Sequence, residues 1–365
     1  MIDLSNSRIL VVDDIEPNVE ILVDMLEDDY MVDVAMDGTA ALKQVESKPP
    51  DLILLDIMMP GINGYEVCRR LKSDTKTAGI PVIFLTALSD EADEAKGLAL
   101  GAVDYIIKPF NRELVKARVR NHLDLKNHRD HLEKLVKERT VELEKTQEVT
   151  IEALSVLAEY RDPETGGHIK RTQNYVKVLA EKVKHHPSYN HYLNDQTIDL
   201  LYQSAPLHDV GKVGIPDNIL LKPDKLTTKE FEVMKRHTII GRETIRRAEE
   251  KLGDESFLTY AREIAEFHQE KWDGTGYPHG LKGEEIPISG RIMALADVYD
   301  ALISKRVYKP PFPHKKAVEI ILEGKGNHFD PLLVDAFVEL QEQFREIALK
   351  YADFEDEIEA LSQKE

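Results

Sequence analysis

Cysteine is almost missing from this sequence, and its scarcity limits how the chain can be stabilised. Cys68 is the single cysteine among 365 residues, so no disulfide framework can form within the chain. Small disulfide-stapled folds of oxidising compartments are therefore excluded, and one thiol is typical of proteins from reducing compartments. On this ground we expect a cytoplasmic protein.

Long apolar runs are also missing. The longest, such as Ile53–Met59, fall far short of the roughly 20 residues that a membrane-spanning helix needs. The opening residues Met1-Ile2-Asp3-Leu4 lack the basic and apolar regions of a signal peptide. The sequence therefore predicts no membrane segment and no secretion signal.

Basic residues are too few to balance the acidic ones. The chain has 48 lysines and arginines against 67 aspartates and glutamates, a formal net charge of −19. Such a surface repels nucleic acids and anionic membranes, so we expect neither as a partner. If the protein handles a phosphate ester, metal ions and a few well-placed cations must provide the local positive charge.

The first third of the chain alternates apolar runs with amphipathic stretches of helical length. The runs are residues 8–12, 31–35, 52–55, 81–85 and 102–106. Several are nearly continuous in Val, Ile and Leu, as in parallel strands that are covered on both faces. Repeated βα units predict a doubly wound, flavodoxin-like α/β domain whose site opens at the carboxyl ends of the strands.

Glycine and proline are nearly absent between residues 111 and 160, which predicts one long helix or two in series. A heptad seam at Leu125, Leu132, Leu135 and Val149 is interrupted by Arg139 and Glu142. This pattern fits either a coiled coil that makes a homodimer or a solvated connector. Beyond residue 161 we expect an all-α domain, followed by an acidic tail that forms a frayed helix.

Polar residues with related chemistry follow the predicted strands. Asp13 and Asp14 follow the first strand, Asp56 ends the third, Thr86 ends the fourth and Lys108 follows the fifth. Clustered carboxylates need a counter-charge, so a hard cation such as Mg²⁺ is expected. Asp56 could then accept a phosphoryl group, with Lys108 and Thr86 contacting its oxygens.

This set resembles the receiver domain of two-component response regulators over residues 5–125. Met59-Pro60-Gly61, Gly64 and Lys108-Pro109-Phe110 also match that family. The resemblance implies that Asp13, Asp14 and Asp56 bind Mg²⁺ and that a sensor histidine kinase phosphorylates Asp56. It further implies that Thr86 and Tyr105 move together as a switch, with Lys108 at the phosphate.

A second group of residues suits transition-metal chemistry. It comprises Glu164, His168, His208, Asp209, His237, His268 and Asp297, with Lys212 nearby. Imidazole with carboxylate and no thiolate favours Fe, Mn or Zn. Two such ions sharing a carboxylate can activate water and hold the oxygens of a phosphodiester.

The second group resembles the HD superfamily of metal phosphohydrolases, and within it the HD-GYP family, over residues 150–345. The matching motifs are His208-Asp209-Val-Gly-Lys212, Trp272-Asp273-Gly-Thr-Gly276-Tyr277-Pro278, Ala296-Asp297-Val-Tyr-Asp300, Arg306-Val-Tyr-Lys309 and His328-Phe-Asp-Pro331. We therefore expect a receiver domain (1–125), a helical connector (126–155), an HD-GYP domain (156–345) and an acidic tail (346–365).

That resemblance implies hydrolysis of cyclic di-GMP to the linear dinucleotide, and in many members to GMP. It implies two or three divalent metals, Fe or Mn, held by Glu164, His168, His208, Asp209, His237, His268, position 269 and Asp297, with Asp209 bridging. Lys212, Asp300, Arg306 and Lys309 would contact the substrate, with His208, Asp209 and Lys212 catalytic. Gly276-Tyr277-Pro278 would shape the site and meet partners such as diguanylate cyclases with GGDEF domains.

One residue departs from the family pattern. Two adjacent histidines are usual before the tripeptide loop, but this chain has His268-Gln269. An amide oxygen is a weaker ligand than imidazole, so we expect an altered or weaker second metal position. Ordinary turnover and a catalytically inactive cyclic di-GMP sensor are the alternatives, as is hydrolysis of another cyclic dinucleotide or a nucleotide monophosphate. A DNA-binding output is disfavoured, because no basic helix-turn-helix follows the receiver.

Overall fold

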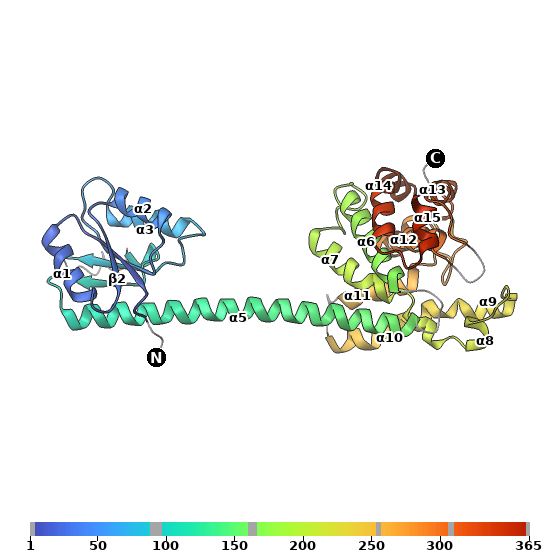
Figure 1. Cartoon of the computed structure of the whole chain (residues 1–365), viewed down its shortest axis with the longest axis horizontal. Coiled ribbons are helices and arrows are strands. Elements are labelled where there is room, and N and C mark those ends of the chain that lie inside the picture. The colour runs from blue at the N-terminus through green and yellow to red at the C-terminus, as the bar shows by residue number, and fades with distance from the viewer. Residues whose placement is uncertain (1–3, 88–96, 160–165, 253–256, 306–309, 363–365) are drawn as a thin grey trace. The chain divides into compact units, whose positions relative to one another are not determined.

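The computed structural model describes residues 4–87, 97–159, 166–252, 257–305 and 310–362 (Figure 1). The chain divides into two compact units, Met1–Glu142 and Leu143–Glu365. Within the described ranges, no helix combines the length and the apolar character that crossing a bilayer demands.

The first unit contains a five-stranded parallel sheet. Its strands are β1 (Arg8–Val12), β2 (Met31–Ala35), β3 (Leu52–Asp56), β4 (Val82–Thr86) and β5 (Asp104–Ile107). The order across the sheet is β2-β1-β3-β4-β5, and every pairing is parallel. The predicted doubly wound fold is confirmed, and the strands differ from the expected runs by at most two residues at either end.

Alternate residues of the central strands fill two separate cores, one on each face of the sheet. Leu10, Ile53 and Phe84 belong to one apolar cluster, with residues of α2 (Gly38–Ser47) and α3 (Gly64–Ser73). Their neighbours Ile9, Leu54 and Ile83 belong to the other cluster, with residues of α1 (Glu16–Leu26) and the start of α5. Burial on both faces explains why these strands are continuously apolar in sequence.

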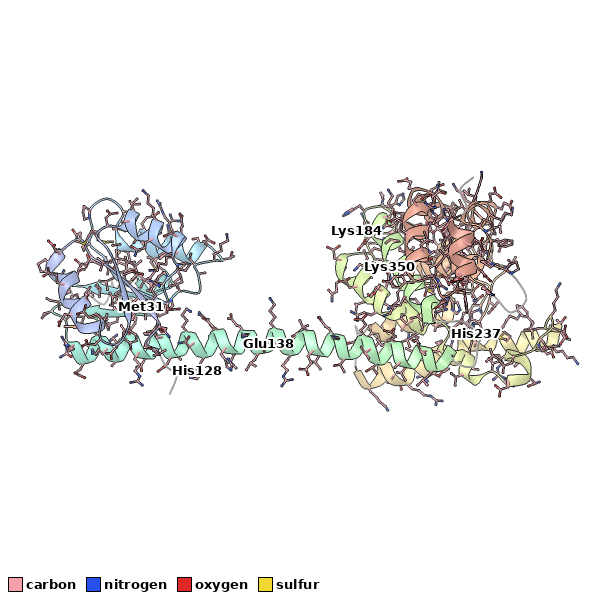
Figure 2. The ribbon with its side chains drawn as sticks, in the orientation of Figure 1. Met31, His128, Glu138, Lys184, His237 and Lys350 are labelled. Atoms are coloured by element: carbon pink, nitrogen blue, oxygen red, sulfur yellow. The ribbon has the colours of Figure 1, made fainter. Side chains whose placement is uncertain are left out.

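Helix α5 (Arg112–Glu159) is one uninterrupted helix of 48 residues, which settles the choice between one helix and two. Val115, Val119 and Leu123 are buried in the first unit, and Ile151 is buried in the second. Between them the apolar residues are exposed, and Figure 2 shows side chains around Glu138 extending outward from the helix.

The second unit consists of helices and loops, and its described residues contain no strand, only one isolated bridge between Lys325 and Phe329. Its elements are α6 (Gly166–Val183), α7 (Asp195–Ser204), η1 (Ala205–Leu207), η2 (Val210–Gly214), α8 (Asp217–Leu220), α9 (Thr228–Met234), α10 (Arg236–Leu252), α11 (Phe257–Phe267), η3 (Gly283–Glu285), α12 (Ile288–Ile303), α13 (His314–Glu323), α14 (Pro331–Lys350) and α15 (Glu355–Ser362). Tyr175 of α6 stacks on Phe344 of α14 with ring centroids 4.5 Å apart, and Tyr299 of α12 meets both rings edge-on. The expected all-α fold is confirmed.

The C-terminal segment differs from its sequence-based expectation. Instead of a frayed tail, α14 continues to Lys350 and α15 follows it. Ala360 and Leu361 are buried, and the buried carboxylate of Glu357 accepts hydrogen bonds from the backbone N–H groups of Lys305 and Asp353. Apolar contacts hidden within an acidic segment therefore hold it against the domain.

Candidate functional site

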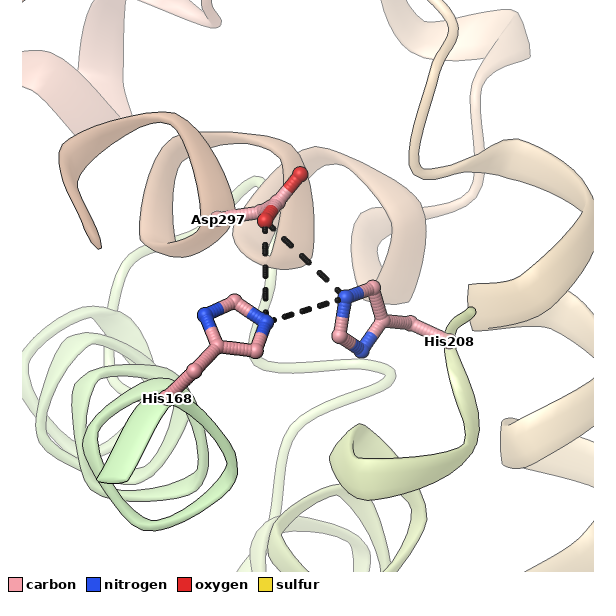
Figure 3. Close-up of side chains that lie close together, drawn as sticks. All are labelled: His168, His208 and Asp297. Carbon is pink, nitrogen blue, oxygen red and sulfur yellow. Dashed lines mark hydrogen bonds and ion pairs between the residues drawn. The ribbon is translucent and has the colours of Figure 1, made fainter. Parts of the chain in front are cut away.

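Four imidazoles and two carboxylates converge in the second unit. Ligand atoms of His168, His208 and Asp297 lie within 4.8 Å of one another, and those of Asp209, His237 and His268 do the same. We call these the His168 cluster and the His237 cluster. In the first, the Nε2 atoms of His168 and His208 are 3.4 Å apart, and each lies about 4 Å from Asp297 Oδ1 (Figure 3).

The four imidazoles turn the same nitrogen toward the centre. Nδ1 of His208, His237 and His268 lies 2.8–3.0 Å from the backbone carbonyl oxygen three or four residues earlier. Nδ1 of His168 instead lies 2.9 Å from Asp300 Oδ2. Each Nδ1–H therefore donates to a fixed acceptor, which leaves the Nε2 lone pair to face the cluster. This orientation is the one that metal coordination requires.

Asp209 lies between the two clusters. Its Oδ1 is 3.4 Å from His237 Nε2 and 3.5 Å from His268 Nε2, whereas its Oδ2 is 3.4 Å from His208 Nε2. In the described part of the chain, Oδ1 is buried without a hydrogen-bond donor. A buried carboxylate oxygen facing imidazole lone pairs is costly unless a cation lies among them. The donor set therefore fits a pair of divalent metals that share Asp209.

Gly211 allows η2, which follows Asp209, to pack closely against α10, which contains His237. A Cβ on Gly211 would lie 1.9 Å from the carbonyl oxygen of His237 and 2.5 Å from the Gly241 backbone nitrogen. Any side chain at position 211 would therefore push η2 away from α10. The close packing keeps Asp209 within reach of His237.

The first unit has its own cluster, formed at the carboxyl ends of β1 and β3. Asp13, Asp14 and Asp56 present oxygens within 4.8 Å of one another. Lys108 Nζ lies 2.7 Å from Asp13 Oδ2 and 2.6 Å from Asp56 Oδ1. Burial raises the pKa of Asp56, whereas these ion pairs outweigh the burial of Lys108 and raise its pKa. Among the described residues, Asp14 Oδ1 is buried without a hydrogen-bond donor, which fits a further cation beside Lys108.

Both constellations match known families. Residues 9–120 match the response regulator receiver domain, and residues 152–333 match the HD domain. A probable cyclic di-GMP phosphodiesterase from Vibrio cholerae is 49% identical over 363 residues, which cover 97% of this chain and 82% of that protein. The cyclic di-GMP phosphodiesterase response regulator RpfG of Xanthomonas campestris is 35% identical and covers 87% of this chain and 82% of its own length. A cyclic di-GMP phosphodiesterase of Thermotoga maritima is 37% identical, with 85% and 84% covered.

The chain belongs to the cyclic di-GMP phosphodiesterase family of response regulators. Its N-terminal unit contains the receiver domain, and its C-terminal unit contains the HD domain, a metal-dependent phosphohydrolase. The two imidazole–carboxylate clusters are the candidate positions for the divalent metals of the HD domain.

Asp300 of the HD domain requires a correction. The sequence places it among the groups that contact the substrate, but its side chain is fully buried behind His168. Both carboxylate oxygens are occupied, because Arg171 Nε donates to Oδ1 at 2.6 Å and Arg171 Nη2 donates to Oδ2 at 2.9 Å. This pairing lowers the pKa of Asp300 despite its burial. Asp300 orients the ring of His168, a candidate metal ligand, and presents no free oxygen to a substrate.

Lys212 lies between the two clusters, where its Nζ is 2.7 Å from Asp209 Oδ2.

Gln269 follows His268 just after the end of α11, and its backbone carbonyl accepts a hydrogen bond from Tyr277 N–H. In the described chain its side-chain amide makes no hydrogen bond with either cluster. Residues 164, 306 and 309, also expected at the site, lie outside the described residues.

The tripeptide loop lies beside the His237 cluster. The rings of Tyr277 and His237 are 6.2 Å apart, and burial together with the carboxylates of Asp209 and Asp297 raises the pKa of Tyr277. The buried carboxylate of Glu270 accepts hydrogen bonds from the backbone N–H groups of residues 279, 280 and 281. Glu270 therefore fixes the loop that contains Gly276 and Pro278 next to the His237 cluster.

In the receiver domain, the expected switch residues occupy neighbouring strands. Thr86 ends β4, and Tyr105 lies on β5. The Tyr105 ring packs under the guanidinium of Arg118, a residue of α5, at 5.3 Å. Arg118 Nη1 also donates to the backbone carbonyl of Tyr105 at 2.8 Å. Tyr105 thus contacts the helix that continues into the HD domain.

Sequence reasoning missed Arg171 and Glu270: Arg171 holds Asp300 behind His168, and Glu270 holds the tripeptide loop. A signal was present: Arg171 follows His168 by three positions and Asp300 follows Asp297 by three, so each pair shares a helix face. The spacing alone, however, does not say which of Asp297 and Asp300 the arginine meets.

Proposed function

We propose that this protein hydrolyses cyclic di-GMP at the HD domain and that phosphorylation of the receiver controls the rate. The observation that carries the proposal is the convergence of three Nε2 atoms, those of His208, His237 and His268, on the buried carboxylate of Asp209. The substrate follows from the family, whose members include phosphodiesterases named for cyclic di-GMP.

The centre would hold two metals, one in each cluster, with Asp209 between them. Nitrogen and oxygen donors without thiolate favour Fe or Mn. Residue 164, which lies outside the described residues, would serve a third metal. Bound divalent cations would activate water and neutralise charge on the phosphodiester.

Several residues would act on the substrate directly. Lys212, which pairs with Asp209, would turn to a phosphate oxygen or protonate the leaving oxygen. Arg306 and Lys309 would bind the phosphates and guanines, Arg306 through its bidentate guanidinium. Tyr277, beside His237, would limit access of water to the phosphodiester.

Turnover is tested directly on full-length protein purified without air and loaded with Fe²⁺ or Mn²⁺. We expect the linear dinucleotide, and GMP on longer incubation, as products separated by chromatography. Asp209→Asn should abolish product formation, because it removes the shared charge. Tight binding of cyclic di-GMP without any product would support the alternative, a sensor that does not turn over its ligand.

Gln269 should weaken the metal position of the His237 cluster, because an amide replaces a second imidazole. Gln269→His is the matched variant, and metal content after dialysis is the measurement. We expect the variant to retain more metal than the wild type. Equal metal content and equal turnover would refute this part of the proposal.

In the receiver, Asp56 would be the phosphoacceptor for a sensor histidine kinase, with Mg²⁺ bound by Asp13, Asp14 and Asp56. The phosphoryl group would draw Thr86 and Lys108 toward it, and Tyr105 would report the change to α5 through Arg118. Hydrolysis rates with and without beryllium fluoride, a phosphoryl mimic, test this control. An unchanged rate and unchanged self-association would contradict it.

Helix α5 would pair with its copy in a homodimer. Five of its apolar residues are 60–69% exposed and follow a heptad-compatible spacing: Leu125, Leu132, Val136, Leu143 and Leu157. Such a stripe is typical of a coiled-coil seam. Leu132→Asp should produce monomers in sedimentation analysis, whereas Val141→Asp, which is exposed but off the stripe, should not. Dimers that survive Leu132→Asp would exclude this seam.

The tripeptide loop would also contact a GGDEF-domain diguanylate cyclase, because Gly276 to Pro278 are only partly buried. Binding measured with Tyr277→Ala and with wild-type protein tests this contact. Wild-type affinity in the variant would exclude Tyr277 from the interface.

A further inference from the structure

His168 is anchored differently from the other three imidazoles. His208, His237 and His268 each place Nδ1 against a backbone carbonyl close by in sequence. His168 alone relies on a carboxylate, that of Asp300, which comes from another helix. Its orientation therefore depends on whatever fixes Asp300.

Arg171 fixes Asp300, and it is 1% exposed. Its guanidinium holds the carboxylate through two hydrogen bonds, and Nη2 also donates to Ser304 Oγ at 2.8 Å. The remaining nitrogen, Nη1, donates to the Tyr351 carbonyl at 2.8 Å and to Asp353 Oδ2 at 3.0 Å. A buried guanidinium needs all of its donors satisfied, and here the C-terminal segment satisfies Nη1.

The segment between α14 and α15 also reaches the first turn of α6 directly. Asp353 Oδ1 accepts a hydrogen bond from the Gly167 backbone N–H at 3.2 Å. A Cβ on Gly167 would lie 2.2 Å from Asp353 Oδ2 and 2.5 Å from the Tyr351 carbonyl oxygen. The absence of a side chain beside His168 therefore lets the segment approach.

We propose that the C-terminal segment, through Asp353, Arg171 and Asp300, positions His168 and sets the metal affinity of the His168 cluster. This inference rests on the proposed use of that cluster as a metal position. Asp353 and Arg171 are positioning residues, because neither touches the metal ligands' coordinating atoms. The His237 cluster has no such connection among the described residues, so the effect should be confined to one of the two positions.

The test measures Mn²⁺ binding to metal-free full-length protein by calorimetry, which needs no substrate. Loss of a partner one step from the ligand typically weakens binding about 10- to 100-fold. For Asp300→Asn we expect this full loss of Mn²⁺ affinity at the His168 cluster. Asp353 lies one step further from the ligand, so Asp353→Ala should weaken Mn²⁺ binding at the same cluster by roughly three- to tenfold. Asp356→Ala is the matched control: Asp356 lies just beyond this segment, in the first turn of α15, and pairs with exposed Lys305. This control should bind Mn²⁺ at the His168 and His237 clusters as tightly as the wild type does.

Double variants assign the effect to a cluster. The Asp353→Ala loss should persist in a His268→Ala background, which damages the His237 cluster, and vanish in a His168→Ala background. Conservative Asp353→Asn, which keeps an oxygen acceptor, should restore part of the affinity. Unchanged affinity in Asp353→Ala, an equal loss in Asp356→Ala, or a loss that persists without His168 would each overturn the proposal. Failure to hydrolyse cyclic di-GMP would leave these binding results intact and would refute only the proposed substrate.

Discussion

Replacing Lys108 should show how strongly the local stability of the receiver domain depends on the charge of this side chain. In Lys108→Met, Asp13 and Asp56 lose their shared partner, and their side chains are only 0% and 6% exposed. Leaving buried charges unpaired typically costs about 3–5 kcal/mol. Since about 1.4 kcal/mol is a factor of ten, local opening of β1 and β3 should become roughly 150- to 4,500-fold more frequent.

Hydrogen exchange read by mass spectrometry on peptides from β1 and β3 measures this change. Lys76→Met, an exposed position in the same domain, is the control and should leave exchange unchanged. Saturating Mg²⁺ should stabilise Lys108→Met more than the wild type, because the ion then neutralises the three carboxylates alone. Less than a tenfold change in exchange, or equal Mg²⁺ stabilisation in both proteins, would refute the reasoning.

Three further outcomes are expected. Gly211→Ala should destabilise the HD domain by about 1–3 kcal/mol, because the new Cβ would collide with the His237 carbonyl, and calorimetry measures the loss. Burial lowers the pKa of His328 to about 4, whereas the unfolded chain takes up this proton near pH 6.5. The free energy of unfolding of the metal-free protein should therefore fall by up to about 3 kcal/mol as the pH falls from 6.5 to 4. Denaturant unfolding should show a smaller fall for His328→Gln, and an equal fall in both proteins would contradict this role of His328. Asp56→Asn should abolish any effect of beryllium fluoride on turnover, and a persisting effect would place the phosphoacceptor elsewhere.

The receiver fold could be predicted closely because its signals are local. Strands such as Leu52–Asp56 are buried on both faces and read as apolar runs. The carboxyl ends of parallel strands meet at one edge, so the order of the residues alone was enough to place Asp13 and Asp56 together. The four histidines of the HD domain were likewise found through family motifs.

The supporting residues could not be predicted in the same way. Asp297 and Asp300 are three positions apart on α12, and the sequence does not say which of them faces the histidine clusters and which pairs with Arg171 of α6. That choice depends on Arg171, which approaches from a helix more than a hundred residues earlier. The acidic C-terminal segment looked like a solvated tail because composition does not reveal that Ala360 and Leu361 are buried.

The backbone carbonyls behind His208, His237 and His268 have a consequence for how the enzyme acquires its metals. Their rings are oriented by carbonyls only three or four residues earlier in the chain, so most of the ordering that coordination demands is complete before an ion arrives. Metal should therefore load into and leave the folded domain without refolding. An enzyme stripped by a chelator should accordingly recover its full ion content when metal is simply added back.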